Sequence, residues 1–290
     1  MSTTQTVPPD SDPTEGPPDR PLPPAPSPWR RRATIGGYIA MALVVVAVLV
    51  RFGGGTARVP RDLPSVPRGA RWDWDFFFAL VPPFLSALWI TVQATLAGFM
   101  VAVLLGFLLA LARRSRIKLL SWPTAFIIEF IRSTPLLIQL FFLFYALPEA
   151  TDIAWSPMVT LIIGLGVHYA TYCSEAYRAG INSVPKGQWE AATALNLGPL
   201  TKWTQVIIPQ AVPNALPALG NYLVAGFKDA PLGATIQVTG VLFYAQTIAN
   251  RAFRPTEAFT LVGIGFLLVS IPAAFAIRRL EKRISYERIS

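Results

Sequence analysis

The chain has 290 residues, of which 53% are hydrophobic and 14% charged, and its mean hydropathy of +0.46 excludes a typical soluble domain. The net charge of +9 does not indicate nucleic-acid binding, because the basic residues stand in short clusters beside apolar segments. The single cysteine and single histidine, Cys173 and His168, exclude an internal disulfide and the usual zinc site; both lie in an apolar segment, where we interpret them as packing residues.

The N-terminal part of the chain differs in composition from the rest. Residues 1–32 are dense in proline and cannot bury a core, so we predict a disordered cytoplasmic tail. Residues 33–50 are an apolar run long enough to span a bilayer, and longer than a usual signal-peptide core. We predict an uncleaved transmembrane helix there, followed by an extracytoplasmic Gly/Pro/Arg linker over residues 51–82, although its arginines oppose the positive-inside rule.

Further apolar segments follow along the rest of the chain. They cover residues 84–111, 119–147, 156–177, 211–238 and 257–277. Basic residues follow the first, third and fifth of them, which by the positive-inside rule places these ends in the cytoplasm. We therefore predict an all-α polytopic membrane protein, with one N-terminal transmembrane helix, five core helices within residues 83–283, and a cytoplasmic tail at 284–290.

A polar island at residues 187–210 separates the third and fourth of these segments. Residues 188–197 are rich in strong helix formers, and Trp189, Ala192 and Leu195 recur at helical spacing on one face. We expect the Gly-Pro pair at 198–199 to end this helix.

A second short helix is expected to begin at Pro199. It would carry Leu200, Trp203 and Ile207 on its apolar side, and Pro209 would mark the entry to the next membrane segment. The whole island is therefore predicted to be a helix-turn-helix elbow lying against a membrane.

Two pairs of opposite charges stand three residues apart in apolar surroundings. Glu129 and Arg132 can neutralise one another beside a kink at Pro135, in a structural or a functional role. Glu175 and Arg178 repeat the spacing just before the elbow, and there we favour structural pairing.

A third charged site interrupts the segment after the elbow. Lys228 and Asp229 are adjacent and are followed by Pro231, which breaks a helix. Ionisable residues inside a membrane segment indicate function, because an unpaired charge in hydrocarbon costs several kcal/mol. Backbone groups freed by the proline could face a polar cavity.

The elbow resembles the EAA loop of ABC importer permeases, which docks into a groove of a separate ATPase subunit. The resemblance rests on the sequence Glu-Ala-Ala at 190–192, a turn, and Ile-Ile-Pro at 207–209. The family usually has Gly six residues after the Glu, where this chain has Asn196; asparagine is the next best residue for a left-handed turn, so we expect the elbow to be retained. The ATPase-coupling residues implied by the resemblance are Gly187, Gln188, Glu190, Ala191, Ala192, Asn196, Gly198 and Pro209.

The resemblance extends over roughly residues 72–283, to the polar amino acid permease family of ABC importers. It is carried by five blocks in chain order: RSTPLLIQ at 132–139, EAYRAGI at 175–181, SVPKGQWEAA at 183–192, IPQA at 208–211 and PALGNY at 217–222. Three stretches, LGVHYATY at 165–172, WEAATALNL at 189–197 and EAFTLVG at 257–263, most resemble ectoine/hydroxyectoine permease subunits. The substrate path that it suggests includes Arg132, Thr134, Gln139, Lys228 and Asp229. Ala230 departs from the family, which usually has Thr or Ser there, and this puts the substrate assignment in question.

The resemblance implies a permease subunit of the type I importer fold in a bacterial cell membrane, with both termini in the cytoplasm. Its expected partners are an ATPase subunit, an extracytoplasmic solute-binding protein, a second permease subunit and a small polar solute. The chain has no phosphate-binding loop, so ATP would bind the ATPase partner, and we expect no cofactor. A membrane-embedded enzyme is disfavoured because no nucleophile–base pair is evident. The alternative is an ion-coupled secondary transporter using Glu129, Arg132, Lys228 and Asp229, although no inverted repeat is visible.

Overall fold

The computed structural model describes residues 72–286, and within them every regular element is helical. The long helices are α2 (Trp74–Arg113), α6 (Pro157–Asn182), α9 (Ile208–Asp229) and α11 (Pro255–Tyr286). The shorter ones are α3 (Lys118–Arg132), α4 (Leu136–Phe141), α5 (Leu147–Thr151), α7 (Lys186–Ala194), α8 (Pro199–Thr201) and α10 (Val241–Ala252). Two π-helical segments, η1 (Phe142–Ala146) and η2 (Lys202–Ile207), and the 3₁₀ segment η3 (Ala230–Ile236) complete the described part. The predicted tail at 1–32, the helix at 33–50 and most of the linker lie outside the described residues.

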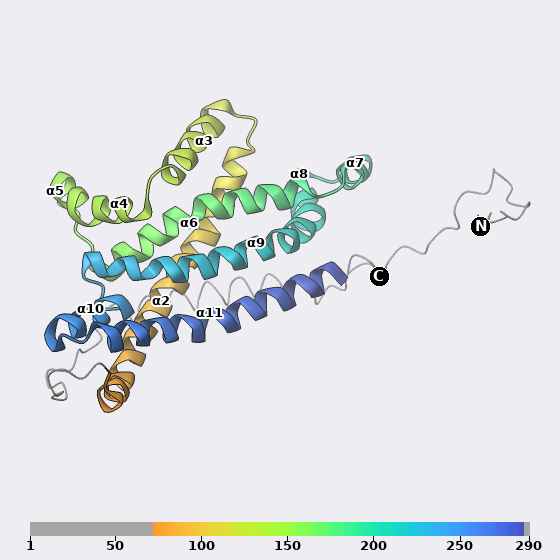
Figure 1. Cartoon of the computed structure of the whole chain (residues 1–290). Coiled ribbons are helices and arrows are strands. Elements are labelled where there is room, and N and C mark those ends of the chain that lie inside the picture. Colours follow the sequence, from red (N-terminus) through yellow and green to blue (C-terminus); the bar gives the residue numbers. More distant parts are fainter. Residues whose placement is uncertain (1–71, 287–290) are drawn as a thin grey trace, which may run out of the picture. The chain divides into compact units, whose positions relative to one another are not determined.

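The long helices form the frame of the bundle. Figure 1 shows α6, α9 and α11 side by side, with α2 crossing behind them, and α2 packs along much of α6. The elbow formed by α7, α8 and η2 lies at one end of this frame, called the elbow end below. The starts of α2 and α11 lie at the opposite end.

A ladder of small residues brings α2 and α6 close together. Alanine or glycine recurs every fourth residue along one face of α2, and all members are buried: Ala94, Gly98, Ala102, Gly106 and Ala110. A Cβ atom on Gly106 would lie 2.6 Å from the Cβ of Cys173 and 2.8 Å from the carbonyl oxygen of Ala170. Small residues at such spacing allow helix backbones to approach closely inside membranes. The sequence contains this ladder, but hydropathy alone does not distinguish its small residues from their neighbours.

Fewer helices qualify as membrane spans than the five predicted. Among the described residues, α2 and the first part of α11 (Pro255–Arg279) are long and apolar enough, and up to four spans result if two bent helix pairs each count as one. Helix α6 does not qualify, although it lies at the centre of the bundle. A helix covered by other helices needs no lipid-facing apolar stripe. The number of crossings therefore stays a prediction.

The segment over residues 119–147, predicted as one core helix with a kink at Pro135, is broken there into two helices. Helix α3 ends at Arg132, and the chain turns by 104° before it continues through α4 and α5. Pro135 explains the break, because proline has no backbone N–H and disfavours helical geometry in the residue before it.

A second break lies between η3 and α10, which the sequence did not predict. The chain bends by 50° there, and Gln237 adopts a left-handed conformation with φ of 67°. The N–H of Val241 donates to Oγ1 of Thr91 on α2 at 3.1 Å, which ties the start of α10 to the bundle. Helix α10 carries a mixture of polar and apolar residues, so no apolar run marks it.

Helix α2 begins earlier and α11 ends later than predicted. The Asp73 side chain accepts from the N–H of Phe76 at 2.8 Å, which starts α2 within the predicted linker. The N–H of Asp73 donates to Glu257 at 3.2 Å, and Glu257 forms a buried ion pair with Arg254 at 2.9 Å. These contacts join the starts of α2 and α11. The backbone of α11 continues to Tyr286, into the region predicted as a tail.

Candidate functional site

The elbow is held together by a small apolar core and a pair of tryptophans. Trp189 of α7 meets Trp203 of η2 edge to face, with ring centroids 5.5 Å apart. Both rings pack against a separate cluster of buried side chains, formed by Ile181, Val184, Ile207 and Ala211. The predicted helix-turn-helix elbow is thus present, with its own core.

The turn after α7 is made by Asn196, as the sequence predicted. Asn196 has φ of 51°, the left-handed conformation that asparagine tolerates. The N–H of Leu197 donates to the carbonyl of Ala192 at 3.1 Å, and the N–H of Asn196 donates to that of Thr193 at 2.9 Å. These two bonds define a Schellman motif. The motif ends α7 at Ala194, so the expectation that the Gly-Pro pair at 198–199 ends it was wrong.

The second half of the elbow runs into α9 without a break. The chain is helical from Pro199 through η2 to Ile236. Pro209 lies in the first turn of α9 and so marks the entry to that segment, as predicted, while the helix continues through it. The π-helical turn of η2 allows the helix to continue, because a wider turn accommodates a proline, which has no backbone N–H to donate.

The outer surface of the elbow combines charged, small and apolar residues. Glu190 and Ala191 are exposed, whereas Ala192 is 3% exposed and packs inward. Leu195 and Leu200 are 73% and 76% exposed, so neither belongs to the inward apolar faces predicted for them. The Schellman turn rotates the chain after Ala194, which takes Leu195 off the face of Trp189.

Polar contacts connect the elbow to the ends of the long helices. Arg114, which follows α2, donates to Asn182 at 2.7 Å, and its guanidinium lies 5.3 Å from the ring centroid of Trp189. Gln210 of α9 donates to Gln188 of α7 at 3.2 Å. A displacement of α7 would therefore also move the residues at the end of α2 and the start of α9.

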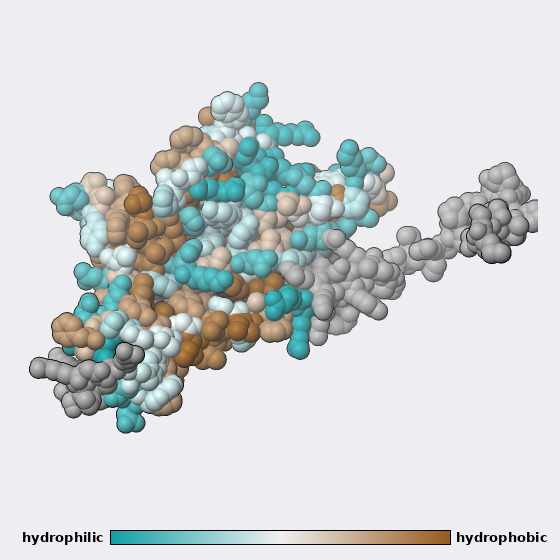
Figure 2. Space-filling model, viewed as in Figure 1, coloured by the Kyte–Doolittle hydropathy of each residue, from teal (hydrophilic) through white to brown (hydrophobic). Residues whose placement is uncertain are grey.

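Between α4, α6 and α9 the structure assembles a set of polar side chains. The hydroxyl of Tyr169 donates to Asp229 at 2.6 Å. Tyr172 lies between Tyr222, with ring centroids 5.7 Å apart, and Arg132, whose guanidinium is 5.1 Å from the Tyr172 ring. Figure 2 shows hydrophilic residues across the middle of this face, with hydrophobic residues over α4 and along α11. We call this set the polar face.

Gln139 adds a second part to the polar face. Its amide nitrogen donates to the carbonyl of Ile131 at 2.7 Å and to Oγ1 of Thr134 at 2.8 Å, across the break between α3 and α4. Its amide oxygen lies 3.2 Å from Nδ1 of His168. His168 is therefore part of a polar network and not only a packing residue, whereas Cys173 is buried in the core, as predicted. The contacts of the polar side chains on α6 with Gln139, Tyr222 and Asp229 could not be found from sequence spacing, because they join separate helices.

One of the two predicted ion pairs is present. Arg178 contacts both carboxylate oxygens of Glu175, at 2.6 and 2.8 Å, which confirms that pair. Among the described side chains, Glu129 and Arg132 form no ion pair. Helix α3 ends at Arg132, and its guanidinium lies over Tyr172 instead, so the predicted neutralisation was wrong.

Lys228 and Asp229 point to different sides of α9. Asp229 accepts from Tyr169 of α6, whereas Lys228 is exposed and lines a cavity of about 460 Å³ between α9 and α11. The polar face therefore holds four of the five residues predicted for a substrate path: Arg132, Thr134, Gln139 and Asp229.

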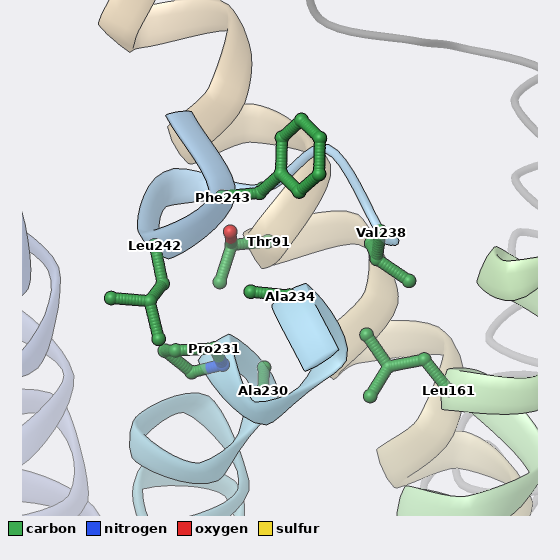
Figure 3. A pocket seen from close by; sticks show the side chains of 9 residues that line it. Thr91, Leu161, Ala230, Pro231, Ala234, Val238, Leu242 and Phe243 are labelled. Atoms are coloured by element: carbon green, nitrogen blue, oxygen red, sulfur yellow. The ribbon is translucent and has the colours of Figure 1, made fainter. Parts of the chain in front are cut away.

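Ala230 lies away from the polar face. It is buried on η3 and, with Thr91 of α2 and Leu161 of α6, borders a space that has no room for a water molecule (Figure 3). A hydroxyl at this position would meet the core next to Thr91. The idea that its absence alters a substrate-lining surface therefore finds no support in this geometry.

Comparison with known proteins gives consistent matches. Residues 102–286 match the family described as "Binding-protein-dependent transport system inner membrane component". The chain is 41% identical over 218 residues to the probable amino-acid ABC transporter permease protein y4tG of Sinorhizobium fredii, covering 73% of this chain and 94% of that protein. It is 30% identical over 218 residues to the glutamine transport system permease protein GlnP of Escherichia coli, covering 73% and 98%. A solved structure titled "Crystal structure of an amino acid ABC transporter with histidines" has a TM-score of 0.69 and 28% identity, covering 74% of this chain and 100% of that one.

Proposed function

Since the chain belongs to the family of binding-protein-dependent transport system inner membrane components, we propose that it is the permease subunit of an ATP-driven importer for a polar amino acid or a solute derived from one. The relatives that support the solute class are named for amino-acid and glutamine transport. The observation that carries the proposal is the elbow: the exposed helix α7 packs on η2, and η2 runs without a break into α9, which borders the polar face.

The elbow surface suits docking to a separate ATPase subunit. Glu190 would anchor the contact electrostatically, and Ala191 would permit close approach. A Cβ atom added at Gly187 or Gly198 would meet nothing within 4 Å in this chain, so both positions leave room for a partner. Leu195 and Leu200 would supply apolar contact area, a role that the sequence did not suggest. Of the residues first assigned to docking, Ala192 supports the elbow from inside, and Asn196 and Pro209 shape it.

Transport would follow from movement of the elbow. Two ATPase subunits closing on ATP would push α7, and the helix running from Pro199 to Ile236 would pass this displacement to the polar face. A solute-binding protein would deliver the solute at the opposite end, and a second permease subunit would complete the path. In this arrangement the elbow and both termini would lie in the cytoplasm, as the basic residues beside the apolar segments favour.

The polar face suits a small solute with both donors and acceptors. Arg132 offers a positive charge, Asp229 a negative one, and Gln139 an amide within a network that includes Thr134 and His168. Ectoine or hydroxyectoine is the narrower candidate that the sequence resemblance suggests, and the buried place of Ala230 does not argue against it.

An ion-coupled carrier is less well supported. That hypothesis used Glu129, Arg132, Lys228 and Asp229 as one site, but Lys228 lines the cavity between α9 and α11, apart from Arg132 and Asp229 on the polar face. An ion-coupled carrier would also work without ATP and would respond to collapse of the proton or sodium gradient.

The test is uptake by the complete transporter in proteoliposomes, with ATP inside and labelled glutamine, arginine or ectoine outside. We expect Glu190→Arg to insert normally but to abolish ATP-driven uptake, because the charge reversal opposes docking. The matched control is Glu149→Arg, which reverses an exposed carboxylate on α5, away from the elbow. Normal uptake by Glu190→Arg would remove the elbow from the mechanism, and uptake that needs no ATP would overturn the proposal.

A further inference from the structure

We propose that the cavity between α9 and α11 is a binding site for an oxyanion group, a carboxylate or a phosphate, held by Lys228, Arg278 and Asn221. The site is distinct from the polar face, because Lys228 and Asp229 leave α9 on different sides. If the oxyanion is the carboxylate of a transported solute, this inference rests on the proposed function; if it is a lipid phosphate, it does not.

The shape of the cavity follows from how α9 and α11 pack. The two helices are in close contact at Gly220, where an added Cβ atom would lie 2.8 Å from Cγ1 of Ile277. The cavity begins at the next residue, Asn221, and extends along α9 to Lys228. Its volume of about 460 Å³ lies in the range typical of small-molecule sites. Short side chains such as Ala225 and Ala274 line it and keep it open.

The charges that line the cavity have one sign. Lys228 and Arg278 both line it, and among the side chains that the structure describes no acidic residue does. Among the described side chains, neither cation has a carboxylate within ion-pair distance. Asp229, the nearest acid in sequence to Lys228, accepts from Tyr169 on the other side of α9. An ionised side chain within a membrane segment is costly without a counter-charge, so Lys228 favours an anion in the cavity, and Arg278, which follows the apolar segment 257–277, adds a second positive charge.

The donor groups define the ligand further. The ammonium of Lys228 and the guanidinium of Arg278 are donors only, and guanidinium matches the paired oxygens of a carboxylate or phosphate. The guanidinium carbon of Arg278 lies 4.5 Å from the ring centroid of Phe275, a cation–π contact, and the guanidinium forms no ion pair among the described side chains. The amide of Asn221 adds a third donor. A cation would be repelled here, and a purely apolar ligand would leave these donors unsatisfied.

The experiment measures binding to the purified full-length chain directly, so its outcome does not depend on transport. One arm places the chain in nanodiscs of mixed phosphatidylglycerol and phosphatidylcholine and counts bound lipids by native mass spectrometry. The other arm uses phosphatidylcholine nanodiscs and compares the binding of glutamine and arginine with that of the corresponding amino alcohols, which lack the carboxylate.

We expect at least one arm to show a preference for the anionic probe of about tenfold, equivalent to about 1.4 kcal/mol. The double variant Lys228→Gln/Arg278→Gln should lose the preference. The single variant Lys228→Met should weaken it, and it provides the test if the double variant folds poorly. Arg279→Gln is the matched control, because Arg279 is the next residue on α11, exposed, and not part of the cavity lining. The proposal is overturned if neither arm shows a preference, if the Lys228 variants bind like the wild type, or if Arg279→Gln loses as much as they do.

Because the readout is binding, this inference and the proposed function can fail separately. Loss of the phosphatidylglycerol preference in the Lys228 and Arg278 variants would identify the phosphate of a net-anionic lipid as the oxyanion. If the Lys228 and Arg278 variants instead lose the preference for amino acids over amino alcohols, the cavity binds the carboxylate of the transported solute.

Discussion

The elbow and the polar face are built in different ways. The elbow is made by a short stretch of chain, and its turn, its tryptophan pair and most of its small core come from residues within one polar island and its flanks. The polar face joins α3, α4, α6 and α9, and its central contact links Tyr169 to Asp229 across 60 residues of sequence. Local backbone preferences encode the first, whereas the second depends on how closely the long helices pack.

This difference predicts different sensitivities to mutation. Changes to the α2–α6 ladder should disturb the polar face more than the elbow, since α6 carries Tyr169 and Tyr172. Changes within the elbow should leave the bundle folded and alter its coupling to a partner. Four sets of substitutions test this difference and are given in order of decreasing effect.

Gly106→Leu should have the largest effect. The added side chain would clash with the backbone at Ala170 and with Cys173, and overpacking of this kind costs about 3 kcal/mol. We expect a lower thermal unfolding temperature in detergent and loss of solute binding. Gly263→Leu is the matched control, because a Cβ atom there meets nothing within 4 Å. Equal destabilisation by both variants would show that α2–α6 packing does not hold the polar face.

Tyr169→Phe should come second. It removes the hydroxyl that donates to Asp229 at 2.6 Å, and a hydrogen bond to a charged group contributes about 2 kcal/mol. We expect reduced solute uptake with ATP hydrolysis by the complex retained. Tyr145→Phe serves for comparison, since its hydroxyl makes a longer, exposed bond of 3.3 Å to Thr235. If Tyr145→Phe reduced uptake as much, the Tyr169 contact would have no special role.

Trp189→Leu should have a smaller effect on stability, about 1 kcal/mol, because leucine keeps apolar bulk but loses the ring contacts with Trp203 and Arg114. Its main effect should be on solute-stimulated ATP hydrolysis by the complex, measured in proteoliposomes. Trp122→Leu, at an exposed tryptophan on α3, should leave that rate unchanged. Unchanged stimulation in Trp189→Leu would contradict a coupling role for the tryptophan pair.

Substitutions of Asn196 should give the smallest effects. Asn196→Gly should be neutral or slightly stabilising, because glycine adopts a left-handed φ without strain. Asn196→Ala should lower the free energy of unfolding by about 1 kcal/mol, because alanine is strained in the left-handed conformation. The thermal unfolding temperatures of the two purified variants would distinguish them. Identical temperatures would mean that the conformation of the turn is not set by backbone preference.

The parts of the structure that the sequence predicted correctly are local. Asparagine's tolerance of a left-handed turn predicted the conformation of Asn196, and a spacing of three residues predicted the ion pair of Glu175 with Arg178. The same spacing failed for Glu129 and Arg132, because α3 ends at Arg132 and the side chain meets α6 instead. A pair rule of this kind holds only where the helix continues.

The parts that were missed depend on packing. The hydropathy of Gly98 and Gly106 does not indicate that they lie in a helix contact, although their lack of a side chain lets α2 approach α6 closely. His168 was interpreted as a packing residue because its apolar segment gave no sign that Gln139 lies beside it. Helix α10 was missed because its polarity is mixed and no apolar run marks it.

The most direct test of the account is one assay of two variants in the complete transporter. Solute uptake and stimulated ATP hydrolysis are measured together for Glu190→Arg and Tyr169→Phe. We predict that Glu190→Arg loses both activities, because the ATPase no longer engages the elbow, whereas Tyr169→Phe keeps ATP hydrolysis and loses most uptake. Uptake at the wild-type level in both variants would contradict the assignment of coupling to the elbow and of the solute path to the polar face.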